Sequence, residues 1–259
     1  MKLTKRNYFS QKANMEFMSV SQFKEFNRCP ASAMAELKGE YKREETISLL
    51  MGSYIDAYFE GDRSFEKFKK EHLEIFKKDG TLKSEYIHVN NIIKRIERDP
   101  LFMEYISGKQ QVIMTGTICG VAVKTKIDSL HPDKIVDFKL MKDFFDIWVE
   151  EKGERLPWFE AWDYPLQGAV YQEIVYQNTG KKLPFFLAAA TKEKEPDIDL
   201  LHIGQKYLDH ALDRFKYNVE MFDAIKKGIV EPERCGKCNY CKSTKVLTEP
   251  IEADEFYLL

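Results

Sequence analysis

The sequence lacks the features of a membrane protein or an exported protein. It has no run of about 18 apolar residues, the shortest stretch that commonly crosses a bilayer as a helix. Its first residues, MKLTKRNYFSQKANMEFMS, are basic but contain no apolar core of the kind an export signal requires. We therefore expect a cytoplasmic protein with no membrane-spanning segment.

The sequence also lacks a strong charge of either sign. Its 259 residues include 40 Lys and Arg against 42 Asp and Glu, a formal net charge of −2. The chain thus has no overall basic charge that would indicate a nucleic-acid ligand, although a groove can be locally basic on a neutral protein. With 44% hydrophobic and 32% charged residues, the composition is typical of a globular domain with a sizeable core.

Cysteine is scarce, and its distribution argues against a disulfide framework. The five cysteines are an odd number, and Cys235, Cys238 and Cys241 form a cluster. Three thiols within seven residues can chelate one metal centre, for which Cys29 is the available fourth ligand. The spacing leaves open iron–sulphur, zinc and a metal-free set of thiols. Cys119 lies in an apolar segment and is expected to be an ordinary buried thiol.

Secondary-structure patterns divide the chain into a helical first part and a mixed second part. Amphipathic periodicity over 19–108 predicts several helices. Val-, Ile- and Thr-rich segments then predict a strand pair within 110–130 and a third strand over 134–140. A helix, a strand and a second helix are expected to follow over 164–180, 183–191 and 205–228.

Three charged residues lie on short apolar segments that are expected to be buried strands. In KIDSLHPDKIVDFKLM, Asp137 and Lys139 are two residues apart, so both side chains project from one face of a strand. If the preceding strand pairs across the HPD turn, Asp128 approaches Asp137. Two neighbouring carboxylates repel unless a proton, a cation or Lys139 lies between them, and Mg²⁺ and Mn²⁺ prefer oxygen ligands. The alternative is an ion pair at a sheet edge.

Four motifs, taken in order, resemble one nuclease superfamily. Asp128 followed by Asp137-Phe138-Lys139 is similar to the PD-(D/E)XK nuclease core. MGSYIDAYFEG resembles the Gly-x-x-x-His helix of its RecB/RecE-like branch, and QGAVYQEIVY resembles the Gln-x-x-x-Tyr helix. SVSQFKEFNRCP resembles the entry helix of that branch, which ends in Cys-Pro. The closest likeness is to the phage exodeoxyribonuclease VIII type of domain.

The resemblance implies a fold and a division of the chain. The fold class is α/β (α+β), with a restriction-endonuclease-like core in which a small central mixed sheet is flanked by helices, plus a helical N-terminal elaboration. We expect a flexible arm over 1–18 and a single domain over 19–259. Within that domain, the helical part, the nuclease core and the cysteine cluster with the tail span 19–108, 109–228 and 229–259. The acidic, apolar tail TEPIEADEFYLL either docks on a neighbour or frays.

The resemblance also implies roles for individual residues. Lys139 positions the attacking water, and Gln167 and Tyr171 hold the DNA backbone or order the lysine. Asp56 stands where the branch usually has His. The implied catalytic set is Asp128, Asp137, Lys139, Gln167 and Tyr171. The implied ligands of Mg²⁺ or Mn²⁺ are Asp56, Asp128, Asp137 and the carbonyl of Phe138.

The cysteine pattern resembles that of iron–sulphur nucleases. A distant N-terminal cysteine with a C-terminal trio is similar to the nuclease domain of AddB-type helicases and to CRISPR-associated RecB-like exonucleases. This likeness implies a 4Fe–4S cluster held by Cys29, Cys235, Cys238 and Cys241, with Zn²⁺ as the less favoured alternative.

Basic and aromatic residues near the Gln-x-x-x-Tyr motif are candidate DNA contacts. Trp158 and Trp162 are interleaved with charged residues, which suits base stacking, although covering the core is the more ordinary role. Lys181, Lys182 and Lys192 are candidate phosphate contacts, although most lysine pairs are only solvated surface.

These inferences predict a Mg²⁺-dependent exodeoxyribonuclease that hydrolyses phosphodiester bonds from duplex ends in phage-type recombination or repair. The resemblance implies DNA as a partner, together with a single-strand annealing protein and a ring-shaped homo-oligomer. One alternative is a non-catalytic DNA-end-binding or repair scaffold. Another is a structure-specific endonuclease built on the same core.

Overall fold

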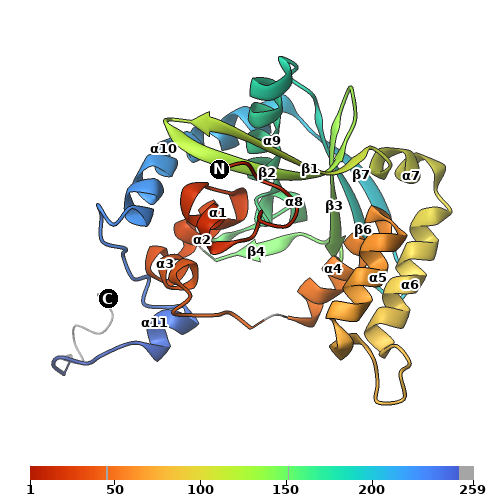
Figure 1. The fold of residues 1–259 in the computed structure, drawn as a ribbon, viewed down its shortest axis with the longest axis horizontal. Helices are drawn as coiled ribbons and strands as arrows, with labels where there is room; N and C mark the ends of the chain where they lie inside the picture. The colour runs from red at the N-terminus through yellow and green to blue at the C-terminus, as the bar shows by residue number, and fades with distance from the viewer. Residues whose placement is uncertain (45, 151, 251–259) are drawn as a thin grey trace.

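A computed structural model describes residues 1–44, 46–150 and 152–250 (Figure 1). The first part is helical: α1 (Gln11–Glu16), α2 (Val20–Arg28), α3 (Pro30–Lys38), α4 (Ile47–Glu60), α5 (Asp62–Glu71), η1 (Leu73–Ile75), α6 (Ser84–Glu97) and α7 (Pro100–Ile106). The second part is mixed: β1 (Lys109–Ile118), β2 (Val121–Leu130), β3 (Ile135–Met141), β4 (Ile147–Val149), β5 (Glu154–Leu156), α8 (Trp158–Ala161), α9 (Tyr164–Thr179), β6 (Phe185–Thr191), β7 (Ile198–Ile203), α10 (Gln205–Lys226) and α11 (Asn239–Ser243). The tail from residue 251, for which docking or fraying is expected, lies outside the described residues.

The central sheet has five strands in the order β1-β2-β3-β6-β7. β3 and β6 are parallel, and the other neighbours are antiparallel. The β1–β2 turn consists of Cys119 and Gly120, with φ of 48° and 73°, the left-handed pair that a two-residue hairpin turn requires. Cys119 is therefore exposed at the turn rather than buried as expected. The mixed sheet with flanking helices confirms the predicted fold class.

Separate hydrophobic cores cover the two faces of the sheet. One core packs α2, α9 and α10 against Phe185 and Leu187, while the other packs α4, α6 and α7 against Val136 and Ala188. Because successive strand residues point to opposite faces, a strand covered on both sides must be apolar at nearly every position. The sequence of β6, FFLAAAT, meets this requirement.

The close approach of α9 to β6 depends on a glycine. A Cβ added at Gly168 would lie 2.4 Å from the ring of Phe185, closer than side chains pack. Gly168 therefore lets the helix sit directly on the strand. This close packing also brings the neighbouring Gln167 within hydrogen-bonding distance of Asp137 on β3.

We predict that Gly168→Ala destabilises the protein by about 1–3 kcal/mol, because the new methyl group displaces the Phe185 ring. Gly52→Ala is the matched control, because a Cβ at this helical glycine would meet nothing within 4 Å. The control should stabilise the protein by up to about 1 kcal/mol through helix propensity. Urea unfolding midpoints measure both effects, and changes of the same sign would contradict the packing argument.

Residues 1–18, for which the sequence predicts a flexible arm, contain α1 and pack on β2. Tyr8 and Met18 are 6% and 0% exposed. Lys124 of β2 is itself buried, and its Nζ donates to the carbonyl of Tyr8 and to Oδ1 of Asn14, both at 2.6 Å. Burial lowers the pKa of Lys124 to about 8. The N-terminal segment thus supplies the oxygen partners of a lysine that would otherwise be buried alone.

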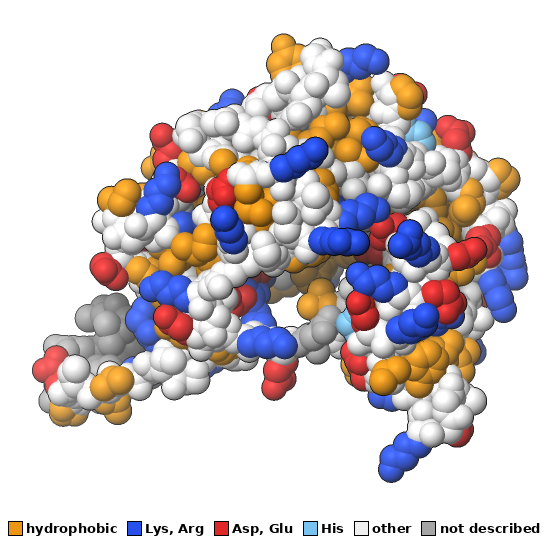
Figure 2. Space-filling model, viewed as in Figure 1, with side chains coloured by type: hydrophobic (Ala, Val, Ile, Leu, Met, Phe, Trp, Pro, Cys, Tyr) orange, Lys and Arg blue, Asp and Glu red, His pale blue; other side chains and the backbone are white. Residues whose placement is uncertain are grey.

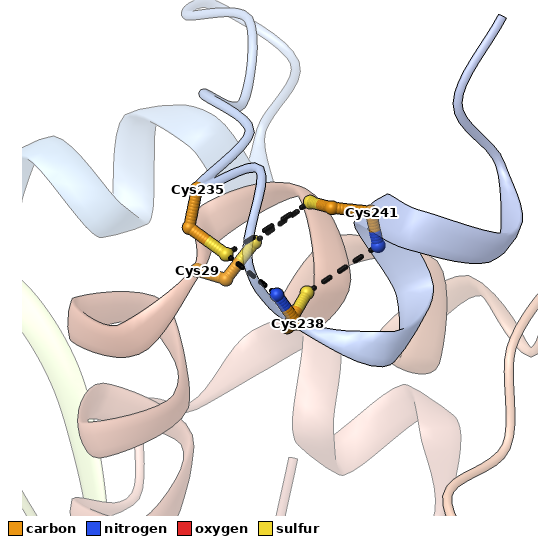
Figure 3. A group of neighbouring side chains, drawn as sticks. All are labelled: Cys29, Cys235, Cys238 and Cys241. Carbon is orange, nitrogen blue, oxygen red and sulfur yellow. Dashed lines mark hydrogen bonds between the residues drawn. The ribbon is translucent and has the colours of Figure 1, made fainter. Parts of the chain in front are cut away.

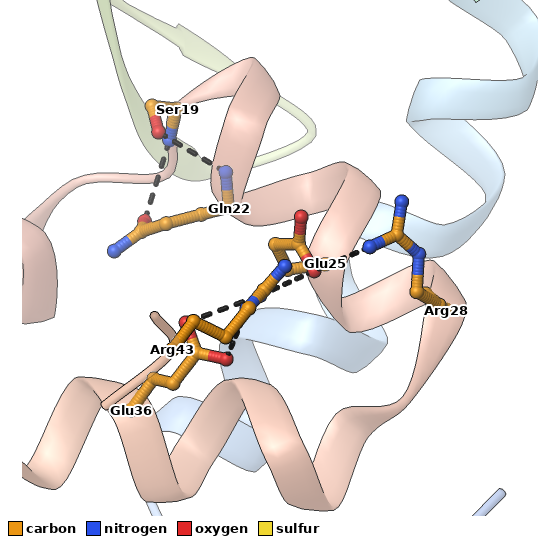
Figure 4. A network of polar contacts seen from close by, with 6 residues as sticks. All are labelled: Ser19, Gln22, Glu25, Arg28, Glu36 and Arg43. Atoms are coloured by element: carbon orange, nitrogen blue, oxygen red, sulfur yellow. Dashed lines mark hydrogen bonds and ion pairs between the residues drawn. The ribbon is translucent and has the colours of Figure 1, made fainter. Parts of the chain in front are cut away.

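The connection from α3 to α4 is fixed at its start by Arg43 (Figure 4). The guanidinium donates to Oε1 of Glu36 at 2.6 Å and to Oε2 of Glu25 at 2.5 Å, and Glu25 also pairs with Arg28 at 3.5 Å. Glu25 belongs to α2 and Glu36 to α3. The network therefore holds together the two helices whose junction carries Cys29.

Candidate active site and cysteine cluster

The candidate active site lies where β2 and β3 separate. The two strands pair through only two residue pairs, next to the turn that joins them. Beyond those pairs Asp128 occupies the gap, and its Oδ2 accepts a hydrogen bond from the backbone N–H of Phe138 at 3.2 Å. A carboxylate thus takes the place that a ladder carbonyl would hold, which brings Asp128 beside Asp137 as the sequence pattern predicts.

Asp137 is fully buried and has a distinct partner for each carboxylate oxygen. Its Oδ1 accepts a hydrogen bond from Nε2 of Gln167 at 2.7 Å, and its Oδ2 forms an ion pair with Nζ of Lys139 at 2.5 Å. In the described ranges, only this Oδ2 and Oε1 of Gln111 are buried side-chain oxygens or nitrogens with no hydrogen bond of standard geometry. This Oδ2, paired with Lys139 and close to Asp128, is of the chemical kind that divalent cations take as a ligand.

The acidic groups of the site shift one another's ionisation. Burial raises the pKa of Asp137 to about 7; Lys139 opposes this shift, and Asp128 adds to it. Asp56 lines a recess together with Gln111, Asp128 and Phe138. Desolvation, reinforced by the charge of Asp128, raises the pKa of Asp56 to about 8, although its side chain remains exposed, so that solvent screens these charges. Burial alone would lower the pKa of Lys139, but Asp137 and Asp128 raise it above its usual value.

Gln167 and Tyr171 of α9 form a short hydrogen-bonded chain between β3 and β2. Besides holding Asp137, Nε2 of Gln167 donates to Oη of Tyr171 at 3.0 Å. The tyrosine hydroxyl donates in turn to the carbonyl of Lys126 at 3.0 Å. The structure therefore brings both predicted residues to the site, where they contact Asp137 and the β2 backbone rather than Lys139.

A second lysine beside the site has no signal in the sequence motifs. Lys24 of α2 donates to the carbonyl of Trp162 at 2.8 Å. Its Nζ lies 5.4 Å from the centre of the Tyr164 ring, and Nζ of Lys139 lies 5.3 Å from the same centre. Burial lowers the pKa of Lys24 to about 8, with Asp163 opposing the shift. Only the tertiary fold reveals this pair of cations on one ring, since α2 and β3 are far apart in the sequence.

The predicted DNA contacts are placed unevenly around the site. Trp158 is 6% exposed and stacks on the partly buried Phe144, so it has the core-covering role that the sequence favours over base stacking. Trp162 is 53% exposed. Lys181 and Lys182 precede β6, whereas Lys192 follows it, beside Met141 at the end of β3. Of the three lysines, only Lys192 is therefore at the same end of the strands as Lys139.

The four predicted cysteines meet in one cluster (Figure 3). Their sulfur atoms all lie within 4.8 Å of one another, with Cys29 and Cys241 buried. Burial raises the pKa of Cys29 to about 12. Burial has the same effect on Cys235, but hydrogen bonds from the backbone N–H groups of Cys238 and Lys237 outweigh it and lower its pKa to about 6. The arrangement could bind a metal, and it ties the α2–α3 junction to the C-terminal segment.

This fold, with Asp128, Asp137 and Lys139 at a strand separation, defines a PD-(D/E)XK-type nuclease core. The family model described as a PDDEXK-like domain of unknown function (DUF3799) matches residues 19–244, and the chain belongs to this family. A crystal structure from Eubacterium rectale, of a protein provisionally described as an exonuclease, is 45% identical in sequence. The similarity covers 99% of this chain and 98% of that chain, with a TM-score of 0.94. No curated protein matches the sequence.

The comparisons confirm the superfamily that the motifs indicate. They support a nuclease, which would act on DNA, and nucleases of this class generally use divalent metal ions. The roles of the individual site residues stay predictions. In the part of the chain that the structure describes, no helix is both long and apolar enough to cross a bilayer.

We predict that Mn²⁺ raises the unfolding temperature more at pH 8 than at pH 6. Asp137 has a folded-state pKa of about 7, against about 3.9 for an exposed aspartate. Folding therefore favours its protonated form, and this stabilisation of the metal-free protein, complete below about pH 4, is lost as the pH rises through about 7. Because Mn²⁺ competes with that proton, its effect grows over the same window. Thermal melts with and without Mn²⁺ measure the difference.

Asp137→Asn is the control for this prediction, because it keeps the shape of the side chain but cannot ionise. It should show little Mn²⁺ effect at either pH. Equal Mn²⁺ shifts at the two pH values in the wild-type protein would contradict the assignment of Asp137 as a ligand.

Proposed function

We propose that this chain is a metal-dependent exodeoxyribonuclease that hydrolyses phosphodiester bonds from duplex ends. The observation that carries the proposal is the meeting of Asp128, Asp137 and Lys139 at the β2–β3 separation. The relative from Eubacterium rectale, provisionally described as an exonuclease, supports attack from DNA ends. Phage-type recombination or repair, an annealing partner and a ring-shaped assembly are the physiological setting that the sequence resemblance implies.

The donor set fits a hard divalent cation. Asp128 and Asp137 would hold Mg²⁺ or Mn²⁺, and the closeness of their two carboxylates at the strand separation supports this assignment. Asp56, which lines the recess, and the carbonyl of Phe138 are the further proposed ligands. When bound, the ion supplies Lewis-acid polarisation of the phosphate and a more acidic water.

Lys139 acts as a cation in this scheme. Its neighbours Asp137 and Asp128 favour the charged ammonium, which can donate hydrogen bonds but cannot take a proton. We propose that it orients the attacking water and offsets negative charge that develops on the phosphate. Gln167 keeps the Asp137 carboxylate turned toward the strand separation, and Tyr171 holds Gln167.

Local positive charge supports a DNA path despite the overall charge of −2. Figure 2 shows a face hollowed between the α1–α3 side and the α4–α6 side, with Lys and Arg side chains around the hollow. We propose Lys24 and Lys192 as phosphate contacts, since Lys24 shares the Tyr164 ring with Lys139 and Lys192 bonds Met141 at the end of β3. Exposed Trp162, next to Lys24, is the aromatic residue available for base stacking.

We predict that Lys139→Ala lowers the rate of digestion of linear duplex DNA in Mg²⁺ by about 100-fold or more, because charge on the phosphate is no longer offset. Lys216→Ala is the matched control, an exposed lysine of α10 that pairs only with Asp213 one turn away. The control should digest DNA at the wild-type rate. The rate of nucleotide release from end-labelled duplex DNA is measured for the wild-type protein and both variants.

A covalently closed circle tests the requirement for an end. The wild-type protein should leave the circle intact and digest it only after linearisation. Cleavage of the closed circle would favour an endonuclease on the same core. Equal digestion by wild-type protein and Lys139→Ala would overturn the catalytic assignment of Lys139. No digestion by either protein would leave the non-catalytic DNA-end-binding scaffold.

We further propose that the four cysteines hold a single tetrahedral ion, for which Zn²⁺ fits. Zn–S bonds of about 2.3 Å place the sulfurs of a tetrahedral site about 3.8 Å apart. The Cys29–Cys241 and Cys235–Cys241 sulfur separations are 3.6 Å and 3.9 Å. A 4Fe–4S cluster, which the sequence pattern favours, needs its thiolates farther apart, because irons and sulfides lie between them.

We predict a colourless protein with about one zinc per chain, because each tetrahedral site takes one ion. Cys29→Ser should lose more than about tenfold in zinc affinity and unfold at a lower temperature. Cys119→Ser, at the exposed hairpin turn, should change neither property. Elemental analysis and the absorbance spectrum decide the identity of the metal. A brown, iron-containing protein would overturn the zinc assignment.

A further inference from the structure

Gln111 stands directly opposite Asp128 in the β1–β2 hairpin. The register pairs Gln110 with Ser129 and Val112 with Ile127, so the intervening partners are Gln111 and Asp128. That one pair is missing from an otherwise continuous ladder. The hairpin is therefore locally distorted at the position that faces the candidate metal ligand.

The distortion is a left-handed backbone at Gln111, with φ of 54°. Among the described residues, two other non-glycine residues have positive φ: Cys119, in the hairpin turn, and Asp163, which precedes α9. Of these three, Gln111 is the one inside a strand, where no turn requires the conformation. Strained backbone of this kind persists where the surrounding structure enforces it, and it is concentrated at functional sites.

The side chain of Gln111 is 7% exposed and points at the candidate site. Its Nε2 donates to Oδ1 of Asp128 at 3.1 Å. Because an ionised carboxylate only accepts hydrogen bonds, this contact fixes which end of the amide is nitrogen. Oε1 is then left buried without a partner. Among the described residues, the one other buried side-chain atom without a hydrogen bond, Oδ2 of Asp137, has the Lys139 ammonium as its ion-pair partner.

We propose that Gln111 is a further cation-binding residue of the active site. Its Oε1 offers an oxygen ligand beside Asp128, while its Nε2 holds Asp128 in place. Amide carbonyl oxygens are accepted ligands of hard divalent cations. A neutral ligand also adds no negative charge to a cluster that already contains Asp56, Asp128 and Asp137. This inference rests on the metal-dependent function proposed above.

The test is Mn²⁺ binding to the full-length protein, measured by electron paramagnetic resonance. The protein is purified with the metal of the cysteine site retained. Gln111→Met keeps the size of the side chain but removes both polar atoms, and it should weaken Mn²⁺ binding about tenfold or more. Gln111→Gly removes the side chain and relieves the positive φ. It should therefore fold at least as stably as the wild-type protein and still lose Mn²⁺ affinity.

Gln111→Glu separates a ligand from a purely positioning role. It keeps an oxygen in the place of Oε1 but loses the N–H that holds Asp128. If the oxygen contacts the ion, this variant should bind Mn²⁺ more tightly than Gln111→Met at pH 8. A Gln111→Glu variant that binds Mn²⁺ no more tightly than Gln111→Met would overturn the ligand role.

Gln177→Met is the matched control, because Gln177 bonds the backbone of Thr117 at the far end of the same hairpin. It should bind Mn²⁺ as the wild-type protein does. Asp128→Ala shows which Mn²⁺ ions bind at the active site, because the ions that this variant no longer binds are those that need Asp128. If Gln111→Met and Gln111→Gly bind Mn²⁺ with wild-type affinity, the role of Gln111 is overturned, while the proposed metal-dependent function stands. Absence of any Asp128-dependent binding in the wild-type protein would overturn the proposed metal-dependent function as well.

Discussion

The hydrogen bond from the backbone N–H of Phe138 to Asp128 is the contact on which the site depends. It lets β2 and β3 separate without leaving that N–H unsatisfied, because a side-chain oxygen replaces the missing strand carbonyl. At the separation the side chains of Asp137 and Lys139 meet, and Asp128 is fixed beside them. A side-chain oxygen thus replaces one backbone hydrogen-bond acceptor, and the sheet is interrupted at this point by charged side chains.

The rest of the fold keeps this opening rigid. Helices cover both faces of the sheet, so β3 and β6 are held by two separate cores. The glycine contact between α9 and β6 carries Gln167 to the Asp137 carboxylate, and Tyr171 ties the same helix to β2. The site is therefore built on regular elements, which hold functional groups more precisely than loops do.

Local sequence patterns predicted the parts of the site that depend on periodicity. Strand alternation placed Asp137 and Lys139 on one face, and helical spacing placed Gln167 and Tyr171 together, as the structure has them. The cysteines were grouped by count and spacing, and their sulfurs do converge. Fold class followed from the order of helices and strands.

Other features depend on contacts between segments that are distant in the sequence. Lys24 reaches the Tyr164 ring from α2, and Lys124 finds its partners in main-chain and amide oxygens of the first residues. The left-handed backbone of Gln111 likewise follows from packing and not from residue type. No local pattern records which oxygen a lysine will meet across the fold.

The cysteine cluster has a consequence for how metal requirement is studied in this protein. Cys29 directly follows α2, the helix that carries Lys24 to the acidic site. If both proposed centres hold metal, a chelator such as EDTA would strip the thiolates as well as the carboxylates, and it would release the C-terminal segment from that helix. Inactivation by EDTA would then report on two centres at once, and only Mg²⁺ and Zn²⁺ added back separately would assign the loss to one of them.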